Sequence, residues 1–279
     1  MRRTRRTRRT RRIRRIRRFG PIPSLLALIA SAAALPAVDP TAAAQASHAV
    51  KSLTRTLPLD PRGEVVIQTY KGRVEVTAWD RREVQIVAQI APDGDPALVP
   101  LTDVRIGGGG ARVVIESDYD RVGEYLRAHA DDEQRFPFVL YAVRMPRTAA
   151  LHIDDHKSDT RVTGLAGDVT IDTHKGHVRV DGLAGAIHLA THKGSADVRF
   201  ARRVAASSFD TFKGSITVAV PAGAGADLVA DLGRRGHLDP APRVSWLRGG
   251  DNIYRARVNG GGPRVELATY KGTLRVETR

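Results

Sequence analysis

The sequence has no cysteine and few aromatic residues. Among its 279 residues there is no Cys, and Phe, Trp and Tyr together make up only 5%. The absence of Cys excludes disulfide scaffolds, thiolate zinc sites, iron–sulfur clusters, cysteine nucleophiles and an N-terminal lipid anchor on cysteine. The scarcity of large rings argues against a thick core built around them. The apolar fraction of 42% is still that of an ordinary folded protein.

The positive charge is concentrated at the N-terminus. The formal net charge is +15, but residues 2–18 alone contain twelve Arg and no acidic residue. An apolar stretch of roughly residues 19–38 follows, and Ala44 and Ala46 flank Gln45 just before Ser47. A basic start, an apolar middle and an A-x-A site are typical of a secretory signal peptide. We therefore expect cleavage after residue 46 and an exported protein, either periplasmic, extracellular or at the cell surface.

Removal of residues 1–46 would leave 33 basic and 29 acidic residues, a formal net charge of +4. Nucleic acid is therefore not an expected partner, although a retained Arg run would bind it non-specifically. Pro21, Pro23 and Pro36 interrupt the apolar stretch, so no stable membrane span is expected after cleavage. An uncleaved membrane anchor is the alternative.

A four-residue phrase recurs through the remaining chain. It consists of Thr, an aromatic residue or His, Lys and Gly, and it begins at Thr69, Thr173, Thr191, Thr211 and Thr269, with a variant at Asp155. The Lys residues at 157, 175 and 193 are spaced by 18, and the next Lys follows after 20. A constant spacing of this kind indicates a structural repeat.

Each 18-residue repeat divides into two segments of nine, in which apolar residues at positions 3 and 5 flank a polar one. This alternation is typical of a strand with one buried face. The sequence therefore predicts an all-β, single-stranded β-solenoid with two strand-plus-corner segments per coil of 18–20 residues. A meander of hairpins with Lys-Gly turns is the alternative. We expect positive φ at the corner glycines, which are Gly72, Gly176, Gly194, Gly214 and Gly272.

The domain layout follows from these patterns. Residues 1–46 are expected to be the signal peptide, 47–62 a linker, and 63–279 the β-solenoid domain. Residues 80–148 and 221–262 interrupt the repeat, and we expect irregular or inserted coils there. A separate domain at 80–148 is the alternative, although no linker composition marks its edges.

The same residues carry a family resemblance. The stretch 72–88, the phrase Val143–Pro146, the glycine-punctuated run 167–185 and the stretch 220–228 together resemble the DUF4097 family of exported bacterial β-strand-repeat proteins, also described as adhesin-domain proteins. The resemblance covers roughly residues 60–279. It implies a β-helix-like architecture and a cell-envelope location, and it brings no catalytic residues. The sequence departs from many relatives in having Lys-Gly where they have Ser-Gly.

One outward position of the repeat carries rings. His156, His174 and His192 occupy it in successive coils, and Tyr70, Phe212 and Tyr270 occupy it elsewhere. Stacked coils would place the three His in a column with steps of about 4.8 Å. We expect a structural stack of rings, with no metal and no cofactor. A Zn²⁺ or Cu²⁺ shared by two imidazoles is the alternative.

The next position of the repeat carries lysine. Lys157, Lys175, Lys193 and Lys213 are predicted to form a line of like charges, moderated by solvent and by Asp154, Asp155, Asp172 and Asp210. Such a line suits an anionic envelope polymer or surface glycan. A solubilising surface that prevents edge-to-edge aggregation is the alternative.

The sequence contains no nucleophile elbow, zincin, Walker or dinucleotide motif. We therefore expect no enzymatic activity and interpret the chain as a cell-envelope scaffold or adhesin-like binding module. The alternative is a carbohydrate-active β-helix enzyme acting on acidic polysaccharide. Carboxylates clustered in a cleft on one sheet face would favour the enzyme, and a flat face of Lys and aromatic residues would favour the binding module.

Overall fold

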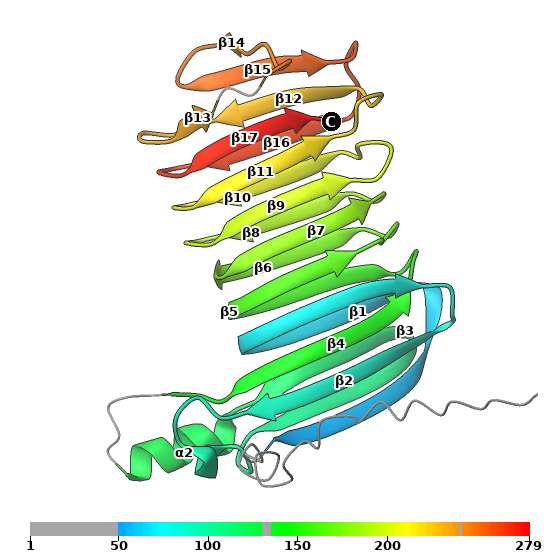
Figure 1. Cartoon of the computed structure of the whole chain (residues 1–279), viewed down its shortest axis with the longest axis vertical. Helices are drawn as coiled ribbons and strands as arrows, with labels where there is room; N and C mark the ends of the chain where they lie inside the picture. The colour runs from blue at the N-terminus through cyan, green and yellow to red at the C-terminus, as the bar shows by residue number, and fades with distance from the viewer. Residues whose placement is uncertain (1–49, 130–134, 240–241) are drawn as a thin grey trace, which may run out of the picture.

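The computed structural model describes residues 50–129, 135–239 and 242–279, so the expected signal peptide lies outside the described residues. Within them the protein is all-β, as expected, with seventeen strands in one mixed sheet. The strands stack along the long axis of the molecule, with the helix α2 at one end and β14 and β15 at the other (Figure 1). No helix of this part of the chain is long and apolar enough to cross a membrane.

The elements follow the chain in this order: β1 (Lys51–Trp79), β2 (Glu83–Ala91), the 3₁₀ helix η1 (Pro96–Leu98), β3 (Asp103–Asp118), α2 (Asp120–Ala128), β4 (Phe138–Pro146), β5 (Ala150–Thr163), β6 (Val169–Lys175), β7 (His177–Leu183), β8 (Ile187–Thr191), β9 (Ser195–Phe200), β10 (Ser207–Thr211), β11 (Ser215–Val220), β12 (Ala226–Asp231), β13 (His237–Asp239), β14 (Leu247–Arg248), β15 (Ile253–Val258), β16 (Arg264–Thr269) and β17 (Thr273–Thr278).

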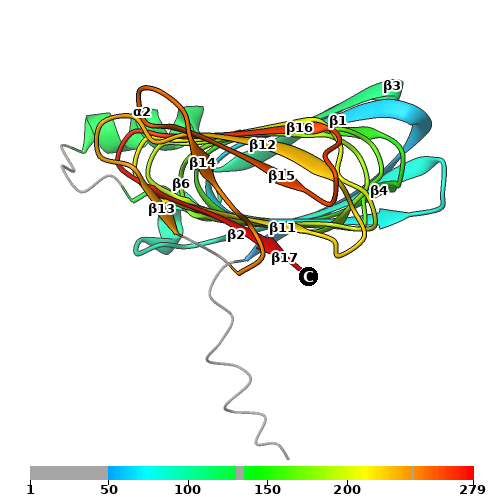
Figure 2. The ribbon, with the colours of Figure 1, turned by 90° about the horizontal axis from the view of Figure 1, so that it is seen from above.

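In the middle of the chain, parallel strands pair at a constant offset. Ile171 of β6 pairs with Ile153 of β5 and with Leu189 of β8, and Val180 of β7 pairs with Val162 and Val198, all 18 residues away. The next offset is 20 residues, between β8 and β10 and between β9 and β11. Seen along the long axis, the strands lie in two layers that are joined at corners (Figure 2). Strands with equivalent sequence positions therefore lie side by side.

The core lies between these two layers. The alternating apolar residues point inward, and Val169, Ile171, Val178 and Val180 are each at most 1% exposed. Each such side chain contributes roughly 1.5–3 kcal/mol on full burial. The Thr at the seventh position of the repeat is buried in β6, β8, β10 and β16. In two of these strands its hydroxyl closes the corner: Gly194 N donates to Thr191 Oγ1 at 3.0 Å, and Gly272 N donates to Thr269 Oγ1 at 2.7 Å.

The order of strands in space departs from the order in the chain at both ends. The last segment, β16 and β17, pairs parallel with β10 and β11 on one side and with β12 and β13 on the other. The chain therefore skips one position with β12 and β13 and returns to fill it. Antiparallel pairs occur between β1 and β2, β2 and β4, β12 and β15, and β14 and β15. The 18-residue arrangement is thus regular only in the middle of the chain.

The expected linker and the first interruption of the repeat are also part of the sheet. Residues 51–62, which belong to the expected linker 47–62, form the first part of β1, and residues 51–58 pair antiparallel with β2. These residues form a strand because they pair with residues far along the chain, and local composition does not indicate such pairing. Within 80–148, the strands β2, β3 and β4 all pair with β1. The short helix α2 packs Val122 and Leu126 in a small cluster with Leu98 of η1.

The corner glycines differ from one another. Gly72 and Gly176 have positive φ, at 142° and 125°, as expected, but Gly194, Gly214 and Gly272 do not. At these three positions glycine is required by the close approach of the neighbouring strand, which acts at Gly72 and Gly176 as well. A Cβ at Gly214 would lie 1.8 Å from the carbonyl oxygen of Gly194. The expectation of positive φ was therefore wrong at Gly194, Gly214 and Gly272. Glycine is needed there because parallel corners stack too closely for any side chain between them.

Candidate functional site

Six rings form a continuous stack along one face of the strands. The successive centroid distances are 4.9 Å between Tyr70 and His156, 4.8 Å to His174, 4.6 Å to His192, 4.8 Å to Phe212 and 5.2 Å to Tyr270. Neighbouring ring planes differ by at most 10°. Parallel pairing places the rings one above the other, so their faces are covered by one another and their edges meet solvent.

The three histidines of this stack occupy parallel planes. Burial, the imidazoles of His156 and His192, and the ammoniums of Lys175 and Lys193 lower the pKa of His174. A zinc ion shared by two imidazoles would need both nitrogen lone pairs to converge at about 2.0–2.1 Å. The lone pairs of an imidazole lie in its plane, and those of stacked parallel rings do not converge. The geometry therefore favours the structural role for His156, His174 and His192.

The lysine column lies beside the rings, at one corner of each repeat. Lys157, Lys175, Lys193 and Lys213 are all exposed, and backbone bonds hold successive corners together, for example from Lys213 N to the carbonyl of His192 at 2.9 Å. None of the four ammoniums makes an ion pair with any residue that the structure describes. Lys193 and Lys213 line a depression of about 590 Å³ together with Lys271.

An acidic column lies on the other side of the rings. Strand pairing aligns Gln68 with Glu116 and with Asp154, then Asp154 with Asp172, Asp172 with Ala190, and Ala190 with Asp210. These six side chains and five of the rings line a groove of about 690 Å³, which we call the acidic groove. Its lining contains no Lys and no Arg.

The acids of this groove do not pair with the lysine column. Glu116, Asp154, Asp172 and Asp210 make no ion pair within the described part of the chain. Any moderation of the lysine charges by these aspartates therefore does not come from ion pairs within the described residues. The acids and lysines lie on opposite sides of the ring stack, because strand positions 6 and 9 are separated by the ring at position 8.

Asp155 is a buried acid at the edge of the same groove. It occupies the inward position that Thr69, Thr173 and Thr191 occupy in neighbouring strands, and it is 5% exposed. Its Oδ1 accepts a hydrogen bond from Ser158 N at 2.8 Å, and its Oδ2 is buried with no hydrogen-bond partner among the described residues. Burial raises the pKa of Asp155 to about 7, against the opposing effect of the nearby hydroxyls of Thr173 and Ser158.

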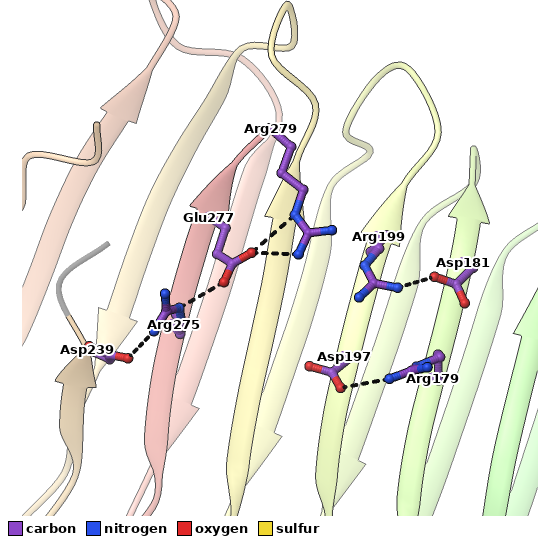
Figure 3. Close-up of polar contacts among 8 residues, drawn as sticks. All are labelled: Arg179, Asp181, Asp197, Arg199, Asp239, Arg275, Glu277 and Arg279. Atoms are coloured by element: carbon purple, nitrogen blue, oxygen red, sulfur yellow. Dashed lines mark hydrogen bonds and ion pairs between the residues drawn. The ribbon is translucent and has the colours of Figure 1, made fainter. Parts of the chain in front are cut away.

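The opposite face of the molecule carries charges that neutralise one another. Arg199 Nη1 lies 2.7 Å from Asp181 Oδ1, Arg179 Nη2 lies 3.9 Å from Asp197 Oδ2, and Arg275 bridges Asp239 and Glu277 across or along the strands (Figure 3). These pairs lie on outward positions of β7, β9, β13 and β17. The same strand geometry thus supports ion pairs on this face, whereas the acids of the acidic groove are unpaired within the described residues.

The sequence predicts the columns of rings and lysines but not the acidic groove. The signal for the groove is the sixth position of each nine-residue segment, where Asp154, Asp172 and Asp210 recur. Glu116 joins them only through the pairing of β3 with β1, which no local spacing reports.

No family model matches the chain, and no curated protein matches it. Among solved structures, it is similar to one named as a candidate cell adhesion protein from Clostridium sporogenes, at 11% identity and a TM-score of 0.46, covering 82% of this chain and 100% of that one. It is also similar to one named as a candidate adhesin from Bacteroides fragilis, at 15% identity and a TM-score of 0.36, covering 82% and 97%. Likenesses at this level carry no argument about the fold or function of this chain.

Proposed function

We propose that the protein is an exported, non-enzymatic β-solenoid that serves as a cell-envelope scaffold or adhesin-like binding module. The observation that carries this proposal is the unpaired lysine column. Four exposed ammoniums at equivalent corners, all without ion-pair partners in the described residues, repeat at the spacing of adjacent parallel strands. Strands lie about 4.8 Å apart, so the column offers a regular row of cationic sites to one linear ligand.

The ligand class that fits this row is an anionic envelope polymer or surface glycan. A line of like charges along one edge attracts a chain of phosphates or carboxylates over its whole length. The backbone bonds between corners hold the row in place without using the side chains. Binding therefore requires no rearrangement of the sheet.

The test is an envelope-polymer and glycan array, followed by affinity measurements at two salt concentrations. A quadruple Lys→Gln variant at 157, 175, 193 and 213 should bind the best polymer at least tenfold more weakly than the wild type. Affinity of the wild type should also fall steeply with salt, because the Debye length shrinks from about 10 Å at 0.1 M to about 3 Å at 1 M.

A matched control removes the same charge from elsewhere on the surface. Arg202, Arg203, Arg234 and Arg235 are exposed and make no ion pair with described residues, so their quadruple change to Gln loses four charges outside the column. This control should keep the wild-type affinity. Equal affinity of the wild type and the lysine variant would remove the column as a binding site.

A carbohydrate-active enzyme is the second candidate, and the acidic groove is the observation that favours it. Asp154 lies in a groove with further carboxylates, and the next residue, Asp155, has a pKa of about 7. Paired carboxyl groups of different pKa are the usual means of glycoside cleavage, although here successive strand residues point to opposite faces of the sheet. Against it, the groove acids would repel the acidic polysaccharide expected as substrate. Release of reducing or unsaturated ends from acidic polysaccharides, abolished by Asp155→Asn, would establish this candidate over the binding module.

A further inference from the structure

Three neighbouring corners of the sheet each consist of Lys, Gly and a residue with a hydroxyl. They span residues 193–195, 213–215 and 271–273, and we call them the hydroxyl corners. Strand pairing aligns them, because Ser215 pairs with Ser195 on one side and with Thr273 on the other. The third corner joins the row because β16 and β17 lie beside β10 and β11, so the regular spacing along the chain does not predict its place.

The hydroxyl corners line one depression and leave their polar groups unused by the fold. All residues of the three corners belong to the lining of the depression of about 590 Å³. The ammoniums of Lys193, Lys213 and Lys271 make no ion pair with any residue that the structure describes. The hydroxyls of Ser215 and Thr273 make no hydrogen bond within the same part of the chain. The row therefore offers cationic groups and hydroxyl donors to a ligand.

An acid lies at one end of this row. Asp159 also lines the depression, and its Oδ1 accepts a hydrogen bond from His177 N at 3.1 Å. His177 in turn pairs with Ser195, the first hydroxyl of the row. In the corner that begins with Lys157, a carboxylate thus occupies the place that a hydroxyl occupies in the hydroxyl corners. An anionic ligand is repelled by this carboxylate, so the lysines along the column are not equivalent.

We propose that the hydroxyl corners bind a linear polymer of phosphodiesters joined by short acyclic polyols. The proposal deepens the proposed function and rests on it, since it names the polymer and the part of the lysine column that binds it. Lys ammoniums and the hydroxyls of Ser and Thr are common partners of phosphate oxygens.

The glycines of these corners favour a ligand whose main chain carries the charge. In a phosphodiester polymer the charged groups are part of the main chain, so the main chain itself has to come close to the protein. Gly194, Gly214 and Gly272 lie between the Lys and the hydroxyl residue and add no side chain to the depression, which permits such an approach. A polymer with carboxylates on side branches does not need it.

The ring stack argues against a ligand that is recognised through flat rings. Proteins that bind single-stranded nucleic acids stack the bases on exposed aromatic faces. His192 and Phe212 precede Lys193 and Lys213 in the chain, and both faces of each ring are covered by neighbouring rings at 4.6–5.2 Å. An acyclic linker between phosphates needs no aromatic face.

The experiment is calorimetric titration of the folded protein with poly(glycerol phosphate) at low salt. A variant with Lys213→Gln and Lys271→Gln should bind at least about tenfold more weakly than the wild type. The comparison variant carries Lys157→Gln and Lys175→Gln, so it loses the same charge from the same column. Its affinity should fall by about threefold at most, because these lysines lie outside the depression.

A second variant tests the hydroxyls without changing the charge. Ser195→Ala, Ser215→Ala and Thr273→Val together should weaken binding of poly(glycerol phosphate) at least about threefold. Binding of polyglutamate of matched charge should not change, since its branched carboxylates can reach the ammoniums alone. The control removes three exposed hydroxyls of β1 and should bind as the wild type does; it carries Ser52→Ala, Thr54→Val and Thr56→Val. Circular dichroism and melting temperature check that each variant is folded.

Several results would overturn the proposal. Equal losses in the two lysine variants would mean that the whole column binds uniformly, which leaves the proposed function standing and removes this inference. Unchanged affinity of the hydroxyl variant, or equal affinity of the wild type for polyglutamate, would reject the phosphodiester. Tighter binding of single-stranded DNA of matched charge would make the surface a nucleic-acid site. Absence of binding to every anionic polymer would remove the proposed function as well.

Discussion

Replacement of Asp155 by Thr should make the protein more stable, and the gain should depend on pH. Burial raises the pKa of this carboxyl from 3.8 to about 7 in the folded state. The folded protein therefore holds this proton more tightly than the unfolded chain does. The contribution of Asp155 to stability falls as pH rises from about 4 to about 7, and it stays at its low value above that.

The size of the effect follows from the shift. About three pKa units, at about 1.4 kcal/mol each, correspond to a penalty of up to about 4 kcal/mol once the carboxyl is ionised. In Asp155→Thr the new hydroxyl can accept the bond from Ser158 N that Asp155 now accepts, as Thr191 accepts from Gly194 N at 3.0 Å. The substitution therefore removes the ionisable group and keeps the corner.

The assay is urea unfolding of the wild type and the variant at about pH 5 and about pH 8, on either side of the shifted pKa. The stability advantage of the variant should be larger by about 2–3 kcal/mol at the higher pH, because only part of the loss occurs between about pH 4 and about pH 5. Asp154→Asn, at the exposed neighbouring position, serves as the control and should show no such divergence. An identical difference at both pH values would refute the argument, since it would mean that Asp155 does not change its ionisation on burial.

Three further predictions concern the repeat and its export. Gly176→Val should lower the melting temperature, because φ is +125° and a Cβ would lie 2.0 Å from the carbonyl oxygen of Ser158. The backbone strain alone should cost about 1–3 kcal/mol. An unchanged melting temperature would contradict the corner geometry. Ile171→Asp should unfold the middle of the sheet by burying an unpaired carboxylate, whereas Asp172→Ile should change stability by only about 0.5 kcal/mol. Similar denaturation curves for the two variants would mean that the strand faces are assigned wrongly. N-terminal sequencing of protein from the producing cell should find Ser47 or a close neighbour first, and a full-length cytoplasmic protein would refute export.

The sequence by itself determined the strands of the repeat and their inward and outward faces. The alternation at Val169, Thr170 and Ile171 is a local property of two-residue periodicity, and it survives in any arrangement that buries one face. The 18-residue spacing also predicted which lysines and which rings would share a column. These features depend on residues close together in the chain, so a single sequence reports them.

Only the tertiary structure decided which strands became neighbours at the two ends. β16 lies between β10 and β12, β17 lies between β11 and β13, and residues 51–58 pair with β2. Long-range pairing depends on the burial and hydrogen bonding of whole strands, and segments with the same alternation are interchangeable by local pattern alone. The acidic groove also depends on long-range strand pairing, because Glu116 belongs to it only through the pairing of β3 with β1. The tight corners at Gly194 and Gly214 depend on this pairing as well, since the atoms that exclude a side chain there belong to the neighbouring strand.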